Sequence, residues 1–201
     1  MITIALDAMG GDFFPNVNID GAISATKKFP IKIILVGNKQ QLEKEIEKRS
    51  NFPKEAITIE HSEDIIEMTD SPSKAFRKKK NSSIHVGLEL VKTKKAQAFV
   101  SAGNTGAVLT ASTFILGRIE GVDRPVLSAV IPSEKKPFVM LDMGSNVDCK
   151  PTQLLQFAIM GHAFSKSIMG IENPKVGLLN IGEQKEKGNI TTQQTHDLLE
   201  E

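Results

Sequence analysis

The sequence predicts an α/β fold, with three α/β/α layers built around a mostly parallel, doubly wound sheet. Short apolar runs alternate with helix-like segments along the whole of the 201 residues. Several of these runs are continuous and rich in β-branched residues, which is typical of strands covered on both faces. Alternating strands and helices favour parallel strands joined by helical crossovers.

Seven apolar runs are predicted to be strands. They cover residues 2–8, 31–36, 57–60, 96–101, 126–131, 138–142 and 176–180. Residues 132–137 alone separate the fifth run from the sixth, which is too short for a helical crossover. These two runs therefore predict a β-hairpin and a locally antiparallel edge.

The segments between the runs are predicted to be helices. They cover residues 16–28, 39–49, 73–80, 84–94, 106–119, 152–169 and 191–201. No internal repeat or low-complexity linker marks a boundary, so we expect residues 1–201 to form a single α/β domain.

The composition is that of a soluble cytoplasmic protein. The 25 basic and 24 acidic side chains give a net charge of +1, which argues against a nucleic-acid partner. A single cysteine forms no internal disulfide and fits a reducing compartment. No apolar run approaches the roughly 20 residues that a membrane-spanning helix needs, and the N-terminal residues read as a strand rather than a signal peptide.

Residues 101–106 predict an anion-binding loop between a strand and a helix. The first amides of a helix have no partner inside it, and the helix dipole adds partial positive charge there. Gly103 and Gly106 allow close approach, and Ser101, Asn104 and Thr105 add side-chain donors. The residues equally fit a capped helix start, with Asn104 or Thr105 as N-cap.

Polar, glycine-containing loops recur after four predicted strands, at residues 7–12, 101–106, 142–148 and 180–183. In open α/β sheets ligands bind outside the carboxyl ends of the strands, so the four loops predict a single cleft. The alternative is ordinary turn chemistry, because turns favour Gly, Asn and Asp.

The ordered motifs of the chain resemble the bacterial phosphate acyltransferase family of phospholipid synthesis. They read DAMGGD at 7–12, PSKA at 72–75, SAGNTGA at 101–107, LGRI at 116–119, NVDCKP at 146–151 and GLLNIGE at 177–183. The resemblance implies a fold related to phosphotransacetylases and to isocitrate and isopropylmalate dehydrogenases. Family members continue beyond Glu201, so residues 1–201 would be the N-terminal part of a longer catalytic domain.

The resemblance also implies a reaction and its partners. A fatty acyl group would move from acyl carrier protein to inorganic phosphate, and a membrane glycerol-3-phosphate acyltransferase would use the acyl phosphate for phospholipid synthesis. The protein would be a cytoplasmic homodimer that associates peripherally with the inner face of the membrane.

The implied step is attack of a phosphate oxygen on a thioester carbonyl. It needs donors that hold phosphate and stabilise the oxyanion, and it requires no covalent enzyme intermediate, metal or cofactor. The candidate catalytic residues are Asp7, Asp12, Asn104, Asp142 and Asn146. The candidate phosphate- and substrate-binding residues are Gly10, Gly11, Ser101, Gly103, Thr105, Gly106, Ser145, Asn180, Glu183 and Lys187.

The residues leave several alternatives open. The aspartates could act as acid, base or magnesium ligands, or only as turn and cap residues. Cys149 stands at a predicted helix start, where a thiol pKa can fall, which would allow an acyl-cysteine intermediate. The basic run 77–80 fits either docking of an acidic carrier protein or a solvated helix end. The rival functions are a non-catalytic carrier-binding fragment and a nucleotide-dependent dehydrogenase, although no Gly-x-Gly-x-x-Gly follows the first strand.

Overall fold

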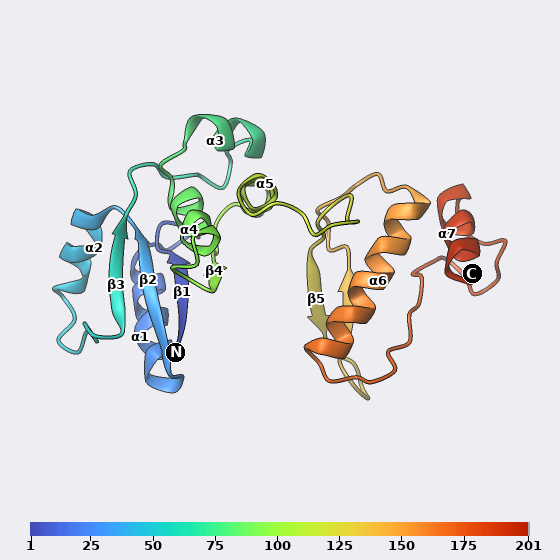
Figure 1. The fold of residues 1–201 in the computed structure, drawn as a ribbon, viewed down its shortest axis with the longest axis horizontal. Coiled ribbons are helices and arrows are strands. Elements are labelled where there is room, and N and C mark those ends of the chain that lie inside the picture. The colour runs from blue at the N-terminus through green and yellow to red at the C-terminus, as the bar shows by residue number, and fades with distance from the viewer. Residues whose placement is uncertain (201) are drawn as a thin grey trace. The chain divides into compact units, whose positions relative to one another are not determined.

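The computed structural model describes residues 1–200 and divides the chain into two compact units, Met1–Gly117 and Arg118–Glu201. Figure 1 shows the helices and strands of each. The single domain over residues 1–201 stays a prediction.

The first unit contains a four-stranded sheet in which every pair of neighbours is parallel, as predicted. Its strands are β1 (Ile2–Asp7), β2 (Ile31–Gly37), β3 (Ile57–His61) and β4 (Ala98–Val100), in the order β3-β2-β1-β4. Leu6 of β1 lies opposite Leu35 on one side and Val100 on the other. The carboxyl ends of β1 and β4 therefore meet at the same edge.

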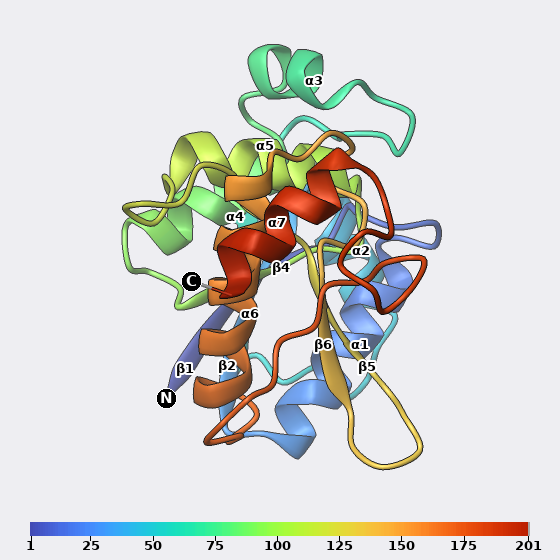
Figure 2. The ribbon, with the colours of Figure 1, turned by 90° about the vertical axis from the view of Figure 1, so that its right-hand side faces the viewer.

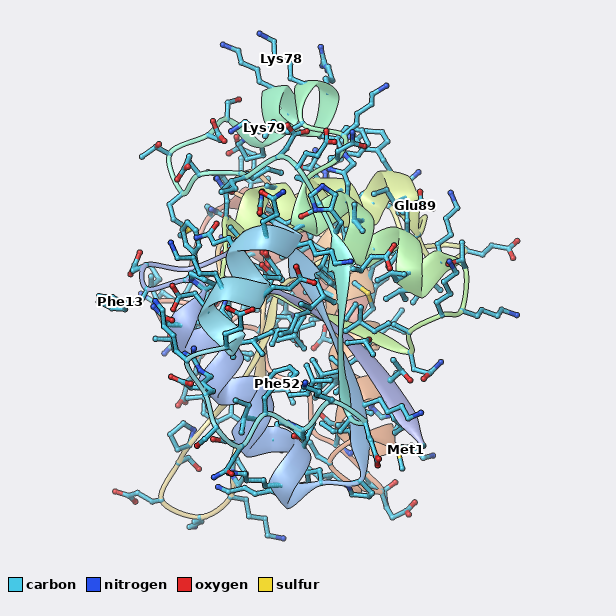
Figure 3. The ribbon with its side chains drawn as sticks, turned by 90° about the vertical axis from the view of Figure 1, so that its left-hand side faces the viewer. Met1, Phe13, Phe52, Lys78, Lys79 and Glu89 are labelled. Atoms are coloured by element: carbon cyan, nitrogen blue, oxygen red, sulfur yellow. The ribbon has the colours of Figure 1, made fainter. Side chains whose placement is uncertain are left out.

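Helices cover both faces of this sheet. They are α1 (Asn16–Lys28) and α2 (Lys39–Ile46) on one face and α4 (Ser83–Lys92) on the other. Ile33 and Leu35 pack with the first pair, and Phe52 points toward the same cluster (Figure 3). Ala5 and Val36 pack on the α4 side. The alternation of side chains along β2 thus fills both layers.

A second core lies among α3 (Pro72–Lys78), α4 and α5 (Thr105–Ile115). Ile84 and Leu88 of α4 pack there against Ala107 and Ala111 of α5. These small alanines allow the two helices to approach closely. The core holds the start of α5 beside the end of β4.

The second unit contains β5 (Ser128–Ile131) and β6 (Phe138–Leu141), followed by α6 (Pro151–Ser167) and α7 (Ile190–Glu200). The two strands pair antiparallel, which confirms the predicted hairpin. α6 packs on β6, and α7 packs on α6 (Figure 2). Gly161 permits the first contact, because a Cβ there would lie 2.8 Å from Leu141 Cδ1.

One predicted strand is wrong. Residues 176–180 have no strand conformation and pair with no strand in residues 1–200. Val176 is 50% exposed and Leu179 is 82% exposed. An apolar run becomes a strand only when a neighbouring strand satisfies its backbone groups, and the described part of this unit provides none at that place.

The other predicted elements are present, with ends shifted by a few residues. α5 ends at Ile115 rather than at residue 119 because Gly117 takes a φ of +86°, which a continuing helix cannot accommodate. Within residues 1–200, no helix is both long enough and apolar enough to cross a membrane.

We expect Gly87→Ala to destabilise the first unit. A Cβ at position 87 in α4 would lie 2.3 Å from the ring of Phe99 in β4, and overpacking of this kind costs about 1–3 kcal/mol. The matched control is Gly21→Ala in α1, where nothing lies within 4 Å. There the change should stabilise by up to about 1 kcal/mol. Urea unfolding of both variants measures the difference, and an unchanged midpoint for Gly87→Ala would contradict the close packing of α4 on β4.

Candidate functional site

A hydrogen bond between Ser101 and Asp7 joins the ends of β4 and β1. Ser101 Oγ donates to Asp7 Oδ2 at 2.7 Å, and the Met9 amide donates to Asp7 Oδ1 at 3.0 Å. Asp7 is 1% exposed, so these donors replace the water that an exposed carboxylate would bind. The Gly103 amide in turn donates to Ser101 Oγ at 3.0 Å. The structure therefore brings together two of the predicted loops.

Gly10 and Gly103 permit this contact. A Cβ on Gly10 would lie 2.4 Å from Asp7 Oδ2 and 2.8 Å from the Gly103 nitrogen. Gly11 takes a φ of +96°, a conformation that residues with a side chain rarely adopt. Glycine is therefore required at positions 10 and 103 by the close approach of the two loops, and at position 11 by its backbone conformation.

Asn18 also holds this loop, although it is not among the site residues predicted from the sequence. Its Nδ2 donates to the carbonyls of Asp7 at 2.9 Å and Gly10 at 3.0 Å. No sequence signal separates Asn18 from an ordinary polar residue in the first turn of a helix.

Asn104 is the N-cap of α5. Its Oδ1 accepts from the Ala107 amide at 3.0 Å, and its Nδ2 lies 3.0–3.2 Å from the carbonyls of Glu67, Met68 and Asp70. The side chain is 7% exposed. Of the two readings of this loop, the capped helix start is thus present, and every polar atom of this side chain already has a partner.

The donors left at the start of α5 are the amides of Thr105 and Gly106, neither of which has an acceptor within residues 1–200. Thr105 is exposed, and its hydroxyl forms no hydrogen bond in that range. Gly106 lies against α3, where a Cβ would come within 2.6 Å of Pro72 Cγ.

Asp12, predicted as a catalytic group, is exposed and likewise has no partner in the described chain.

In the second unit, Asp142 organises the loop that follows β6. It accepts from Ser145 Oγ at 2.6 Å, from the Leu127 amide at 2.9 Å and from the Asn146 amide at 2.6 Å. Asn146 Nδ2 also donates to the Pro125 carbonyl at 3.1 Å. Three predicted site residues, Asp142, Ser145 and Asn146, therefore form one cluster.

Burial alone would raise the pKa of Asp142. The hydrogen bonds from Ser145, Leu127 and Asn146 outweigh it and hold this pKa below its usual value. Asp142 is thus a stable acceptor that stays ionised at neutral pH.

Cys149 does not have the lowered pKa that its place at a helix start suggested. Burial raises the pKa of its thiol, and the charges of Asp142 and Asp148 raise it further against the opposing effect of Arg124. A thiol with a raised pKa contains little thiolate at neutral pH, which disfavours an acyl-cysteine intermediate.

Asn180 holds the loop at residues 180–188. Its Nδ2 donates to the Lys187 carbonyl at 2.9 Å, and its Oδ1 accepts from the Ile181 amide at 2.9 Å. Glu183 and the Lys187 side chain are exposed and form no ion pair within residues 1–200. The single cleft formed by all four loops stays a prediction.

One group in residues 1–200 has ligand atoms close enough together for a metal ion: His196, Asp197 and Glu200 of α7. Lys185 Nζ already lies 2.7 Å from Asp197 and 3.4 Å from Glu200. A bound cation would have to displace this ammonium group, so the cluster is better described as a surface ion pair.

The fold places the chain in the class of α/β proteins to which phosphotransacetylases belong. The structure is similar to that of the EutD phosphotransacetylase from Staphylococcus aureus, with a TM-score of 0.68 over 99% of this chain and 63% of that chain. The sequences are 20% identical, so the likeness shows a shared α/β fold.

The sequence then defines the family. Residues 2–201 match the model of a family described as "Fatty acid synthesis protein", and the chain belongs to that family. The chain is 46% identical over 196 residues to a phosphate acyltransferase of Geotalea daltonii and 46% identical over 199 residues to one of Clostridium botulinum. These matches cover 98% of this chain but 56% and 59% of the relatives. They confirm the resemblance to the phosphate acyltransferase family.

We expect Asn104→Ala to destabilise the first unit by about 1–2 kcal/mol, because it removes an N-cap and leaves the carbonyls of Glu67, Met68 and Asp70 without this donor. Thr105→Ala, one residue along, removes a hydroxyl that has no partner within residues 1–200 and should change the stability by less than about 0.5 kcal/mol. Chemical unfolding measures both. Equal effects would show that Asn104 does not hold the loop in this way.

We expect Asp142→Ala to destabilise the second unit by about 2–3 kcal/mol, since the donors around it lose their acceptor. Asp148→Ala, which changes an exposed carboxylate of the same loop, is the control. Because the pKa of Asp142 is lowered in the folded state, its contribution is full above the ordinary value of 3.8 and is lost as the pH falls below it. The stability difference from the parent protein should therefore narrow below pH 3.8, and a difference that stays constant would contradict the lowered pKa.

Proposed function

We propose that the protein transfers a fatty acyl group from acyl carrier protein to inorganic phosphate and so forms an acyl phosphate for phospholipid synthesis. The observation that carries the proposal is the identity of 46% over 196 residues to a relative named phosphate acyltransferase. Because the chain spans 56–59% of the length of such relatives, the activity of the whole protein is inferred from a part.

In the proposed reaction, a phosphate oxygen attacks the thioester carbonyl carbon. A C–O bond forms, the C–S bond breaks, and the electron pair leaves with the carrier thiolate, which is then protonated. Both phosphate and the tetrahedral intermediate carry negative charge, so the site must supply fixed donors. The amides of Thr105 and Gly106 have no acceptor within residues 1–200, and together with the Thr105 hydroxyl they are donors of this kind at a helix N-terminus.

The other predicted residues support this end of α5. Asp7 and Ser101 fix the loop through their mutual hydrogen bond, and Gly103 gives its amide to Ser101. We therefore assign Asp7 and Ser101 a positioning role and Thr105 direct contact with phosphate. The catalytic roles predicted for Asp12, Asp142 and Asn146 remain part of the proposal.

The proposed partners are acyl carrier protein as donor, a membrane glycerol-3-phosphate acyltransferase as acceptor of the product, and a second copy of the protein. Arg77 and Lys78 lie in the last turn of α3, where cations suit the helix dipole. Lys79 is paired with Asp70 at 2.5 Å. Part of the positive charge of residues 77–80 thus stabilises α3 and the segment packed on it. The proposed docking of the carrier protein on this helix end rests on the charge of Arg77, Lys78 and Lys80.

The direct test is to incubate the protein with long-chain acyl carrier protein and phosphate in the presence of hydroxylamine. We expect acyl phosphate to be trapped as an acyl hydroxamate in a phosphate-dependent way. Trapping no faster than in the absence of enzyme would contradict the proposal. Carrier-protein binding without any trapping would instead identify a non-catalytic binding protein.

Thr105→Val should raise the KM for phosphate by about 10- to 100-fold, because one hydrogen bond to a charged group is worth about 1.5–3 kcal/mol. The matched control is Thr113→Val on the same helix, where the hydroxyl donates to the Leu109 carbonyl at 2.7 Å and lies far from the loop. An unchanged KM for Thr105→Val would remove Thr105 from the phosphate site.

A further inference from the structure

A lysine outside the candidate site holds the segment to which Asn104 is bonded. Lys79, the C-cap residue of α3, donates through Nζ to the Ile65 carbonyl at 2.7 Å and lies 2.5 Å from Asp70 Oδ2. Its side chain is 31% exposed, whereas the lysines of the other ion pairs within residues 1–200 are 53–59% exposed. The neighbouring Lys78 points away from the unit (Figure 3). Lys79 is thus the member of the basic run that is built into the fold.

The carboxylate of Asp70 closes a turn back to Glu67. Its Oδ2 accepts from the Glu67 amide at 2.9 Å, and the Asp70 amide donates to the Glu67 carbonyl at 3.1 Å. The hydrogen bonds from Lys79 and from the Glu67 amide lower the pKa of Asp70, so this group is ionised at neutral pH. The carbonyls of Glu67, Met68 and Asp70 that meet Asn104 Nδ2 at 3.0–3.2 Å all belong to this turn. Hydrogen bonds therefore link Lys79 to Asn104 through one turn.

An N-cap does not need this second set of contacts. Asn38 caps α2 in the same way, since its Oδ1 accepts from the Gln41 amide at 3.0 Å, but its Nδ2 has no acceptor within residues 1–200. Asn104 Oδ1 makes the equivalent bond to the Ala107 amide at 3.0 Å. The contacts of its Nδ2 thus restrain the residue directly before Thr105 more than capping alone requires.

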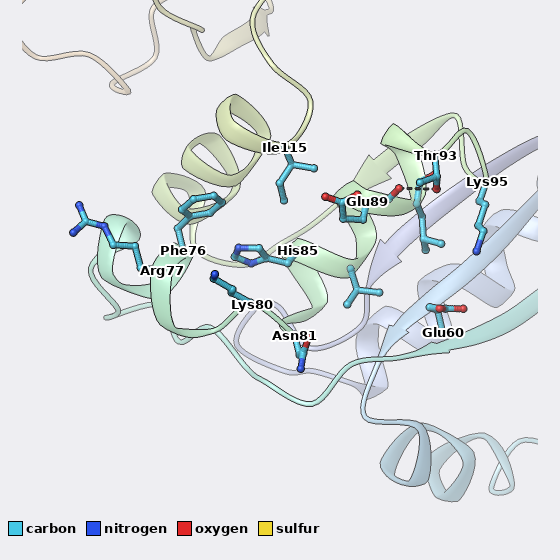
Figure 4. Close-up of a pocket in the computed structure, with 12 residues that line it drawn as sticks. Glu60, Phe76, Arg77, Lys80, Asn81, His85, Glu89, Thr93, Lys95 and Ile115 are labelled. Carbon is cyan, nitrogen blue, oxygen red and sulfur yellow. Dashed lines mark hydrogen bonds between the residues drawn. The ribbon is translucent and has the colours of Figure 1, made fainter.

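The same segment also limits the position of Gly106. Pro72, the first residue of α3, lies so close that a Cβ on Gly106 would come within 2.6 Å of its Cγ. Beside the last turn of α3, Phe76 and Lys80 line a cavity of about 710 Å³ (Figure 4). Packing around this end of α3 is therefore incomplete, and the polar contacts of Lys79 hold it to the segment that precedes the helix.

We propose that Lys79 and Asp70 are positioning residues for phosphate binding, which fix the start of α5 through Asn104 and so hold the orientation of the Thr105 and Gly106 amides. The inference rests on the proposed function, because that function assigns these two amides to phosphate. Neither Lys79 nor Asp70 touches the anion. Donors that are held in place before binding stabilise an anion without a cost of reorganisation.

The kinetics of acyl hydroxamate formation test the positioning role. Lys79→Met should raise the KM for phosphate by about 3- to 10-fold and leave kcat nearly unchanged, because displaced donors bind the anion less well in ground state and transition state alike. Lys79→Arg keeps a cationic donor for Asp70 and should restore most of the binding. The control, Lys48→Met, removes an exposed ion pair of 2.7 Å to Glu45 and should change nothing. An unchanged KM for Lys79→Met, or an equal rise for Lys48→Met, would overturn the proposal.

Two further comparisons separate positioning from carrier docking. A rise in the KM for acyl carrier protein, with that for phosphate unchanged, would mean that Lys79 acts through its charge on the carrier, and it would contradict the positioning role. In an Asn104→Ala background, Lys79→Met should cause little further rise in the KM for phosphate, because the link is already broken. Effects of the two changes that multiply would show that Lys79 does not act through Asn104.

Hydrogen exchange, measured by NMR on the whole chain, tests the link without catalysis. In Lys79→Met, the Ala107 amide should exchange about 3- to 10-fold faster than in the parent, because its acceptor on Asn104 is less firmly held. The Gln41 amide, bonded to Asn38 in the same way, is the internal reference and should not change. An unchanged rate at Ala107 would overturn the proposal. Faster exchange in a protein whose parent traps no acyl hydroxamate would support the link and contradict only the proposed reaction.

Discussion

The parallel pairing of β1 with β4 is the constraint on which the candidate site depends. It places Asp7 and Ser101 at neighbouring strand ends although they are separated by more than 90 positions in the sequence. The hydrogen bond between them at 2.7 Å then fixes the loop that leads into α5. A shift of one residue in this pairing would move Asp7 to the other face of the sheet.

Glycine at positions 10 and 103 makes that pairing compatible with two loops. Because a Cβ on Gly10 would meet both the Asp7 carboxylate and the Gly103 amide, the loops are in contact through their backbones. Close backbone contact leaves little space for water, which strengthens the buried hydrogen bonds. The motif at 7–12 and the motif at 101–107 are thus two halves of one packing arrangement.

Much of this arrangement of strands and loops could be predicted from the sequence, because apolar runs and the polar residues after them mark the ends of strands directly. The role of Asn104 could be predicted only in part. Its cap is a local interaction, but its bonds to the carbonyls of Glu67, Met68 and Asp70 depend on where a distant segment folds. Residues 176–180 show the converse, since an apolar run lacks strand structure where the described chain offers no partner.

The hydrogen bonds of the loop also decide which of its groups can meet an anion. The side chain of Asp7 lies near the start of α5, and a carboxylate there repels phosphate in a medium of low dielectric constant. Ser101 and the Met9 amide face this carboxylate, and the Gly103 amide polarises the Ser101 hydroxyl in a short chain of donors. The side chains of Ser101 and Asn104 already form hydrogen bonds that hold the loop together. Within residues 1–200, the donors of this loop that have no acceptor are the amides of Thr105 and Gly106 and the Thr105 hydroxyl, so the proposed contact with phosphate rests on these groups.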